Sequence, residues 1–338
     1  MLIALSRLMK RDRHVFNYYP TPFPDEHLAS VMYRAFILTY FVDIESHFKN
    51  RQKHIFFNTP SRCWVPAFKH LVTYFSNNQT LDRLLKQHSN LMDYSLLAIS
   101  DNHIASLFDT LASLGRANWK LSVHIGTDRG WRYCPVCVNE NVELYGTSYW
   151  HASHQRFYQR TCSQHRTVLK VSPNAKFALP TIHSGEVAER ASVEEHELDK
   201  KLATIVQSLR LVPTVERRKR VIFAVKQKLN IADGDTSRYS YNGRRLSQLH
   251  ELLTDAINTP EILHYFTFDK AIAQQAPFTS ISGLYQMLNF NNQMHPLWYI
   301  ILIHIFLNED DKLIAFDPKV DWSCAKHSIG NNVMPIAC

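Results

Sequence analysis

Apolar residues recur at every third or fourth position over long stretches in both halves of the chain, a spacing that predicts amphipathic helices. In the first half the pattern begins after Asp25, a residue type that caps helix N-termini. It resumes after Pro66 and ends at Gly115, a residue type that stops helices. In the second half it occupies residues 202–211, 215–229, 246–257 and 297–307. This pattern predicts a mainly α fold.

The helical spacing of apolar residues is absent between residues 119 and 169, where short aromatic runs and turn residues alternate with cysteines and histidines. Further on, an acidic stretch at residues 186–200 is followed by a basic one at 201–250, a change that indicates a domain junction. We therefore expect three parts: an N-terminal helical region at 1–118, a central module at 119–175, and a C-terminal helical region at 176–338.

Two pairs of metal-binding residues lie in the central module. Cys134 and Cys137 form the first pair, and after 24 residues Cys162 and His165 form the second. Each tight turn points two ligands at one ion, and thiolates with one imidazole favour Zn²⁺. Four protein ligands leave no open position for a catalytic water. We therefore predict a small zinc-ribbon or zinc-finger module with one structural zinc ion; the alternative is a set of buried free cysteines.

Other metal-capable residues are weaker candidates. His151 and His154 lie between the two pairs and are alternatives to the histidine of the second pair, but their aromatic neighbours indicate packing or a partner contact. Near the C-terminus, Cys324, His327 and Cys338 partly repeat the motif without a fourth ligand. We do not expect a second zinc ion at these three residues.

The charge of the chain favours a polyanionic partner. Its 338 residues have a formal net charge of +8, and residues 201–250 hold eleven basic residues against three acidic ones. In this stretch residues 215–229, a turn at 233–235 and a helix entered near Asn242 resemble a helix-turn-helix. The residues expected to face phosphates are Arg217, Arg218, Lys219, Arg220, Arg244 and Arg245. The alternative is a solvated pair of charged helices.

Several function classes find no support in the sequence. It contains neither a phosphate-binding G-x-x-x-x-G-K-[ST] loop nor the G-x-S-x-G or H-E-x-x-H motif, so we do not expect an enzyme. The longest apolar run, residues 297–307, is too short to span a membrane. The first 13 residues carry charge after their apolar stretch and none before it, the wrong order for a secretory signal. We therefore expect a cytoplasmic protein.

Particular segments of the chain resemble the TniQ/TnsD family. Residues 131–138, 145–151 and 162–169 are similar to the zinc-finger core of the family. Residues 23–30 resemble its beginning, a short Pro-Asp-Glu turn that leads into the first helix, and residues 295–297 resemble a segment near its end. The resemblance therefore covers most of the chain, from about residue 20 to about residue 310.

Members of this family select targets for Tn-seven-like transposons, including CRISPR-associated ones. The resemblance implies a non-catalytic adaptor that links target DNA or a guide-RNA effector complex (Cascade) to the AAA+ ATPase of the transposon, of TnsC type, and that acts at the bacterial nucleoid. Short members often bind the effector as dimers, so a homodimer is a further expectation. The chain departs from the family at Arg166, where glycine is frequent, and in lacking a long C-terminal DNA-binding extension. The latter departure favours the effector-bound mode.

Two other functions remain open from the residues alone. One is a zinc-containing DNA-binding transcription regulator, which would work without a transposase. The other is a zinc-dependent nuclease, which would need an open metal position and a general base. The two Cys/His pairs and the basic stretch do not favour either of these functions over the adaptor.

Overall fold

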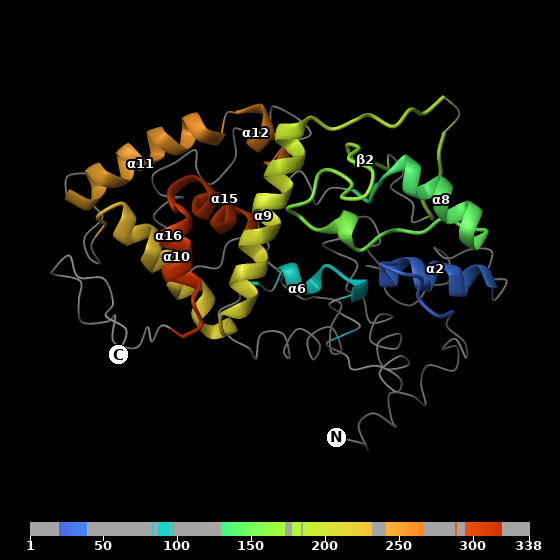
Figure 1. Ribbon diagram of the computed structural model, residues 1–338, viewed down its shortest axis with the longest axis horizontal. Helices are drawn as coiled ribbons and strands as arrows, with labels where there is room; N and C mark the ends of the chain where they lie inside the picture. The colour runs from blue at the N-terminus through green and yellow to red at the C-terminus, as the bar shows by residue number, and fades with distance from the viewer. Residues whose placement is uncertain are drawn as a thin grey trace, which may run out of the picture.

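The computed structural model is mainly helical (Figure 1). It describes residues 20–38, 83, 87–94, 96–97, 130–172, 178–183, 185–231, 241–257, 259–266, 288 and 295–319. The helix predicted after Pro66, the turn at 233–235 and the C-terminal residues Cys324, His327 and Cys338 lie outside this part of the chain. None of the described helices is long and apolar enough to cross a membrane.

The N-terminal part contributes helix α2 (Leu28–Leu38) and the short helix α6 (Leu91–Tyr94). Helix α2 begins at Leu28, directly after His27, and is not capped by Asp25 as the sequence predicts; the Asp25 carboxylate instead accepts from the amide of Ser153 at 3.1 Å. The apolar positions Leu28, Val31 and Ala35 of α2 are fully buried. Arg34 on α2 forms a buried ion pair with Glu26 in the preceding turn, at 2.6 Å, and its guanidinium lies over the Phe23 ring. This pair ties the turn at residues 23–27 to the helix.

The central module is built around a small antiparallel sheet, in which strand β1 (Arg132–Tyr133) pairs with β2 (Lys170–Val171). Between the strands lie helix α8 (Pro135–Tyr145) and the 3-10 helix η3 (Ser153–Gln155). Helix α8 begins with a proline, whose fixed φ suits a first helical position. It ends at Gly146, which adopts the left-handed conformation, with φ of 70°.

The N-terminal turn pairs with the central module across more than a hundred residues of sequence. The amide of His27 donates to the carbonyl of Trp150 at 2.7 Å, and the amide of Ala152 donates to the carbonyl of Asp25 at 2.7 Å. The hydroxyl of Tyr149 also donates to the carbonyl of Pro24. Helix α2 consequently lies beside the module, below α8 in the view of Figure 1.

The C-terminal part is a group of helices around a buried one. Helix α15 (Pro296–Phe306) is buried along most of its length, and α9 (Val193–Leu211) and α10 (Thr214–Lys228) pack against it. Helix α16 (Glu309–Phe316) packs on α9 and α10, and α11 (Tyr241–Ile257) contacts α12 (Pro260–Phe266). The four helices predicted in this half are therefore confirmed.

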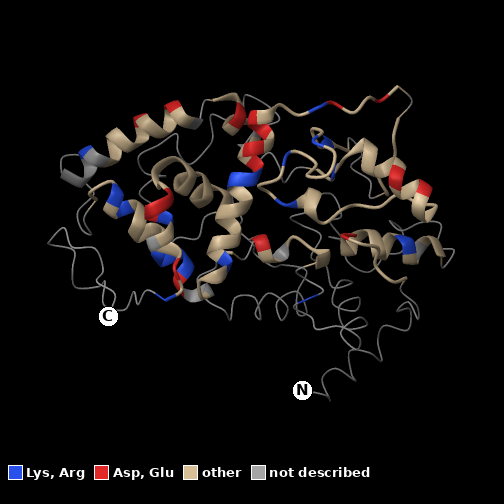
Figure 2. Cartoon of the chain, in the orientation of Figure 1, with Lys and Arg blue, Asp and Glu red and all other residues tan. Residues whose placement is uncertain are grey.

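The change from acidic to basic composition near residue 200 does not mark a boundary between two structural units, contrary to the junction expected there. It falls inside α9, which Figure 2 shows with acidic residues near its beginning. Ser192 and Glu195 form a capping box at that end, and acidic side chains in a first turn are stabilised by the helix dipole. The acidic stretch therefore leads into a long helix, which stands in Figure 1 between the central module on its right and α10, α15 and α16 on its left.

Candidate metal centre

The four predicted ligands come together in the structure. Cys134 lies just before α8 and Cys137 lies in its first turn, while Cys162 and His165 belong to the turn that precedes β2. Their ligand atoms all lie within 4.8 Å of one another. The three cysteines are buried, and the His165 side chain is 14% exposed.

The spacing of the four ligand atoms fits a tetrahedral metal site. Bond lengths of about 2.3 Å to sulfur and about 2.0 Å to nitrogen place two sulfurs about 3.8 Å apart, and sulfur and nitrogen about 3.5 Å apart. The sulfurs of Cys137 and Cys162 are 3.6 Å apart, and Nδ1 of His165 lies 3.2 to 3.6 Å from the three sulfurs. A disulfide would need sulfurs about 2.0 Å apart. The cluster can therefore hold one metal ion.

The three neighbouring thiols also affect one another's protonation. The neighbouring thiols of Cys137 and Cys162 lower the pKa of Cys134. The same contacts hold the protons on the other two thiols: the pKa of Cys162 is raised to about 11 and that of Cys137 is also raised. Three thiolates this close repel one another. A bound cation would remove the remaining protons by compensating this repulsion.

Two further side chains orient the ligands. Oε1 of Glu140 lies 3.0 Å from Nε2 of His165, which turns the other ring nitrogen, Nδ1, toward the sulfurs. The hydroxyl of Thr167 lies 3.1 Å from the sulfur of Cys134. Glu140 is not among the residues that the sequence predicts for the site. Its position three residues after Cys137 is the signal that could have found it, because that spacing places both residues on one face of α8.

His151 and His154 lie next to the cluster without belonging to it. The His151 ring contacts Asn141 at 2.9 Å and Asp25 at 3.3 Å. His154 is buried, its Nε2 lies 4.0 Å from the sulfur of Cys137, and burial lowers its pKa to about 3. The two imidazole rings pack together with centroids 4.7 Å apart. Both histidines therefore pack beside the ligands, as the aromatic stretch predicts.

Position 166, directly after His165, has a backbone conformation that favours glycine. Arg166 has φ of 53°, in the left-handed region where glycine is least strained. Its amide donates to the carbonyl of Cys162 at 2.9 Å, and its carbonyl accepts from the amide of Ala191. The turn thus keeps its backbone hydrogen bonds with arginine in place of glycine.

A buried carboxylate joins the central module to the C-terminal helices. Asp199 on α9 accepts hydrogen bonds from the amide and the hydroxyl of Thr161, both at 2.7 Å, and from the amide of Arg160. The hydroxyl of Tyr265 on α12 and the side chain of Gln159 also donate to it. Burial raises the pKa of Asp199, although these hydrogen bonds oppose the shift.

The basic residues predicted to face phosphates do not form one exposed surface. Arg218 and Arg220 are buried, only 4% and 3% exposed, and this part of the expectation is wrong. Arg220 pairs with Glu216 at 2.6 Å and donates to the carbonyl of Asp317. The physical reason is that α10 packs on α15 and α16, so a helix with four consecutive basic residues turns some of them inward.

The other members of the predicted set differ in exposure. Arg217 is half-buried and donates to the carbonyls of Val212 and Arg210. Lys219 on α10 and Arg244 on α11 are exposed. The side chain of Arg245 lies outside the described part of the chain. Two of the six are therefore seen in positions from which they can reach a nucleic acid.

Comparison with known proteins adds no relative on which a function could be based. No protein-family model matches the chain, and no curated protein matches it.

Proposed function

We propose that the cluster binds one structural zinc ion and that the chain is a non-catalytic target-selection adaptor of the TniQ/TnsD type. The observation that carries this proposal is the spatial arrangement of the segments that resemble the family. The turn at 23–27 pairs with residues 149–152, and the two knuckles at 134–137 and 162–165 meet at one cluster. Segments that resemble one family in sequence also contact one another in this chain.

Zinc is the ion that the donor set favours. Three thiolates and one imidazole are soft or borderline ligands, which suit zinc and do not suit magnesium or calcium. All four positions are supplied by the protein, so no site remains for a water that the metal could activate. In the proposed role the ion holds the two knuckles together and supports the surface of the module.

The adaptor would connect a nucleic-acid partner with the AAA+ ATPase of a transposon. We place the nucleic-acid contact on α10 and α11, proposed to act as a helix-turn-helix in which α11 is the recognition helix. Arg244 supports this placement, because it is exposed in the first turn of α11, where recognition helices contact bases. The partner carrying the nucleic acid would be target DNA or a guide-RNA effector complex.

Metal analysis of the purified protein tests the zinc assignment. We expect about one equivalent of zinc per chain, retained through gentle purification. The Cys137→Ser variant should lose the metal and unfold the module, whereas Cys324→Ser, the matched control, should keep both. Less than half an equivalent in the unaltered protein, or full zinc in Cys137→Ser, would contradict the assignment.

Affinity purification together with the products of neighbouring genes tests the adaptor role. We expect an AAA+ ATPase to co-elute, along with effector proteins and their guide RNA. Recovery of a specific duplex without an ATPase would favour a transcription regulator. Plasmid cleavage that a chelator abolishes would favour a nuclease.

A further inference from the structure

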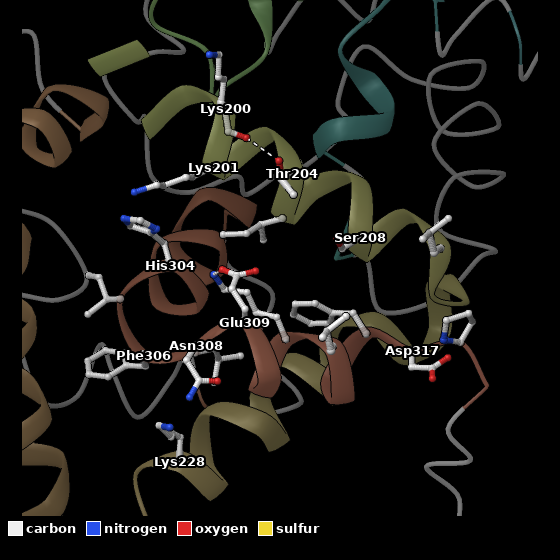
Figure 3. A pocket seen from close by; sticks show the side chains of 18 of the residues that line it. Lys200, Lys201, Thr204, Ser208, Lys228, His304, Phe306, Asn308, Glu309 and Asp317 are labelled. Carbon is white, nitrogen blue, oxygen red and sulfur yellow. Dashed lines mark hydrogen bonds and ion pairs between the residues drawn. The ribbon is translucent and has the colours of Figure 1, made fainter. Parts of the chain in front are cut away.

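Away from the Cys/His cluster, a groove of about 1260 Å³ lies among α9, α15 and α16 (Figure 3). Lys200 and Lys201 line it together with Glu309 and Asp317, so its lining carries both signs of charge. The charges of the groove therefore favour no class of ligand over another.

Beside the Cys/His cluster, by contrast, one buried imidazole faces a ligand sulfur. His154 in η3 is only 4% exposed, and its Nε2 lies 4.0 Å from the sulfur of Cys137, at the outer limit of an N–H···S hydrogen bond. Its ring packs against that of His151, with centroids 4.7 Å apart. The packing holds the ring of His154 in an orientation that presents one nitrogen to the sulfur.

The ligand sulfurs have a need for such donors once a metal is bound. Three thiolates against one Zn²⁺ leave one negative charge in excess, and all three cysteines are buried. A buried charge is stabilised only where polar groups of the protein take the place of water. N–H and O–H groups that donate to the ligands therefore support metal binding.

Two side chains from outside the ligand set approach the sulfurs. The hydroxyl of Thr167 lies 3.1 Å from the sulfur of Cys134, and Nε2 of His154 lies 4.0 Å from that of Cys137. Within the described ranges, these are the side chains outside the ligand set that lie in hydrogen-bond range of a ligand sulfur. His154 is therefore the side chain that can compensate the charge on Cys137.

The surroundings of the His154 ring decide which nitrogen carries the hydrogen. Its Nδ1 is buried and has no hydrogen-bond partner among the described residues. A ring with its hydrogen on Nδ1 alone would bury a donor without an acceptor, and the lone pair of Nε2 would face the thiolate. A hydrogen on Nε2 points toward the sulfur instead. A protonated ring carries this hydrogen as well, so the donor role of Nε2 does not depend on the charge of the ring.

We propose that His154 is a positioning residue of the metal centre, whose Nε2–H donates to the thiolate of Cys137. The contact stabilises the negative charge on this sulfur and holds Cys137 in its ligating position. The inference rests on the zinc assignment proposed above, and it does not depend on the adaptor role.

Nuclear magnetic resonance of the zinc-loaded full chain tests the tautomer directly. The protein is labelled with ¹⁵N-histidine, and long-range ¹H–¹⁵N correlations distinguish the nitrogen that carries the hydrogen. We expect His154 to be protonated at Nε2 and bare at Nδ1. Its signals are assigned by their loss in His154→Gln.

Cobalt loaded in place of zinc tests the contact with the thiolate. A donor to sulfur raises the energy of the sulfur-to-cobalt charge-transfer band, because it stabilises the sulfur lone pairs. His154→Phe keeps a ring and removes the N–H, so the band should move to longer wavelength, and zinc affinity should fall about tenfold. His154→Gln, whose amide nitrogen can replace Nε2 as the donor, should keep both close to the values of the unaltered protein.

His151→Phe is the matched control for disturbed packing. It replaces the neighbouring ring, whose nitrogens contact Asn141 and Asp25 and no sulfur, and it should leave the cobalt band in place. An equal shift of the band in His151→Phe and His154→Phe would overturn the inference.

Other results would also overturn it. These are a hydrogen on Nδ1 alone, or an unchanged band and affinity in His154→Phe. A metal-bound Nε2 would make His154 a ligand in place of His165. If His154→Phe does not fold, the tautomer in the unaltered protein still decides. An unaltered protein that takes up neither ion would overturn the zinc assignment itself, whereas full uptake with one of the negative results above would overturn only the role of His154.

Discussion

Asp199 accepts two hydrogen bonds from Thr161, the residue that precedes Cys162 in the metal cluster. The same carboxylate accepts a hydrogen bond from the hydroxyl of Tyr265 on α12. One buried side chain of α9 therefore fixes the second knuckle and a C-terminal helix at the same time. The Cys/His cluster and the helical part of the chain are joined through this residue.

The first prediction concerns this junction. Asp199→Asn should lower the free energy of unfolding by about 3 kcal/mol, because the amide replaces one acceptor with a donor that faces buried N–H and O–H groups. Urea unfolding followed by circular dichroism measures the change. Glu197→Gln, an exposed substitution on the same helix, is the control and should leave the midpoint in place. Equal midpoints for Asp199→Asn and the unaltered protein would contradict the role of Asp199.

The second prediction concerns the carboxylate that orients His165. Glu140→Gln should weaken zinc retention about 10- to 100-fold, because the ring loses the charged partner that holds Nδ1 toward the sulfurs. Competition with a chromogenic chelator measures the affinity. Glu143→Gln is the matched control, since Glu143 is exposed on the same helix and makes no ion pair with another described residue. The same zinc affinity in both variants would show that Glu140 does not support metal binding.

The third prediction concerns pH. His27 lies fully buried before α2, where its Nδ1 accepts from the amide of Ala29 at 3.2 Å and its Nε2 lies 3.3 Å from the Asn90 carbonyl oxygen. Burial lowers its pKa from 6.5 to about 4. Between these two values the unfolded chain binds a proton that the folded protein excludes. Stability from this residue is therefore complete above pH 6.5 and is lost as the pH falls toward 4.

His27→Asn tests this pH dependence, because asparagine can cap α2 and does not titrate. At the steepest point the unaltered protein should lose about 1.4 kcal/mol per pH unit more than the variant. Unfolding by urea between pH 7 and pH 4.5, at constant zinc, gives both slopes. Their difference isolates His27 from the carboxylates and metal ligands that titrate in the same range. Parallel slopes would show that His27 does not contribute.

The fourth prediction separates two adjacent basic residues of α10. Arg220→Ala should lower the free energy of unfolding by about 2 kcal/mol, because it leaves Glu216 and the carbonyl of Asp317 without their buried donor. Lys219→Ala should leave stability unchanged. If α10 contacts duplex DNA, Lys219→Ala should reduce the slope of log affinity against log salt by about 0.9. An Arg220→Ala variant as stable as the unaltered protein would contradict the buried contacts of Arg220. An unchanged salt slope in Lys219→Ala would show that Lys219 does not contact the DNA.

The sequence alone determined the Cys/His cluster and the helices because both depend on local spacing. Two residues between the ligands of each pair turn both side chains of that pair to one side, whatever surrounds them. Apolar residues at every third or fourth position likewise bury one face of a helix. The ligand set Cys134, Cys137, Cys162 and His165 could therefore be read without a structure, and so could the four helices of the second half.

Only the tertiary structure decided which polar groups are buried and what they contact. The pairing of Asp25 with Ala152 and the hydrogen bonds of Asp199 join residues far apart in sequence, and no local pattern encodes such pairs. In a run of four basic residues the sequence cannot show that Arg220 turns inward while Lys219 remains exposed. That choice depends on where α15 and α16 pack against α10, and it is therefore a property of the assembled core.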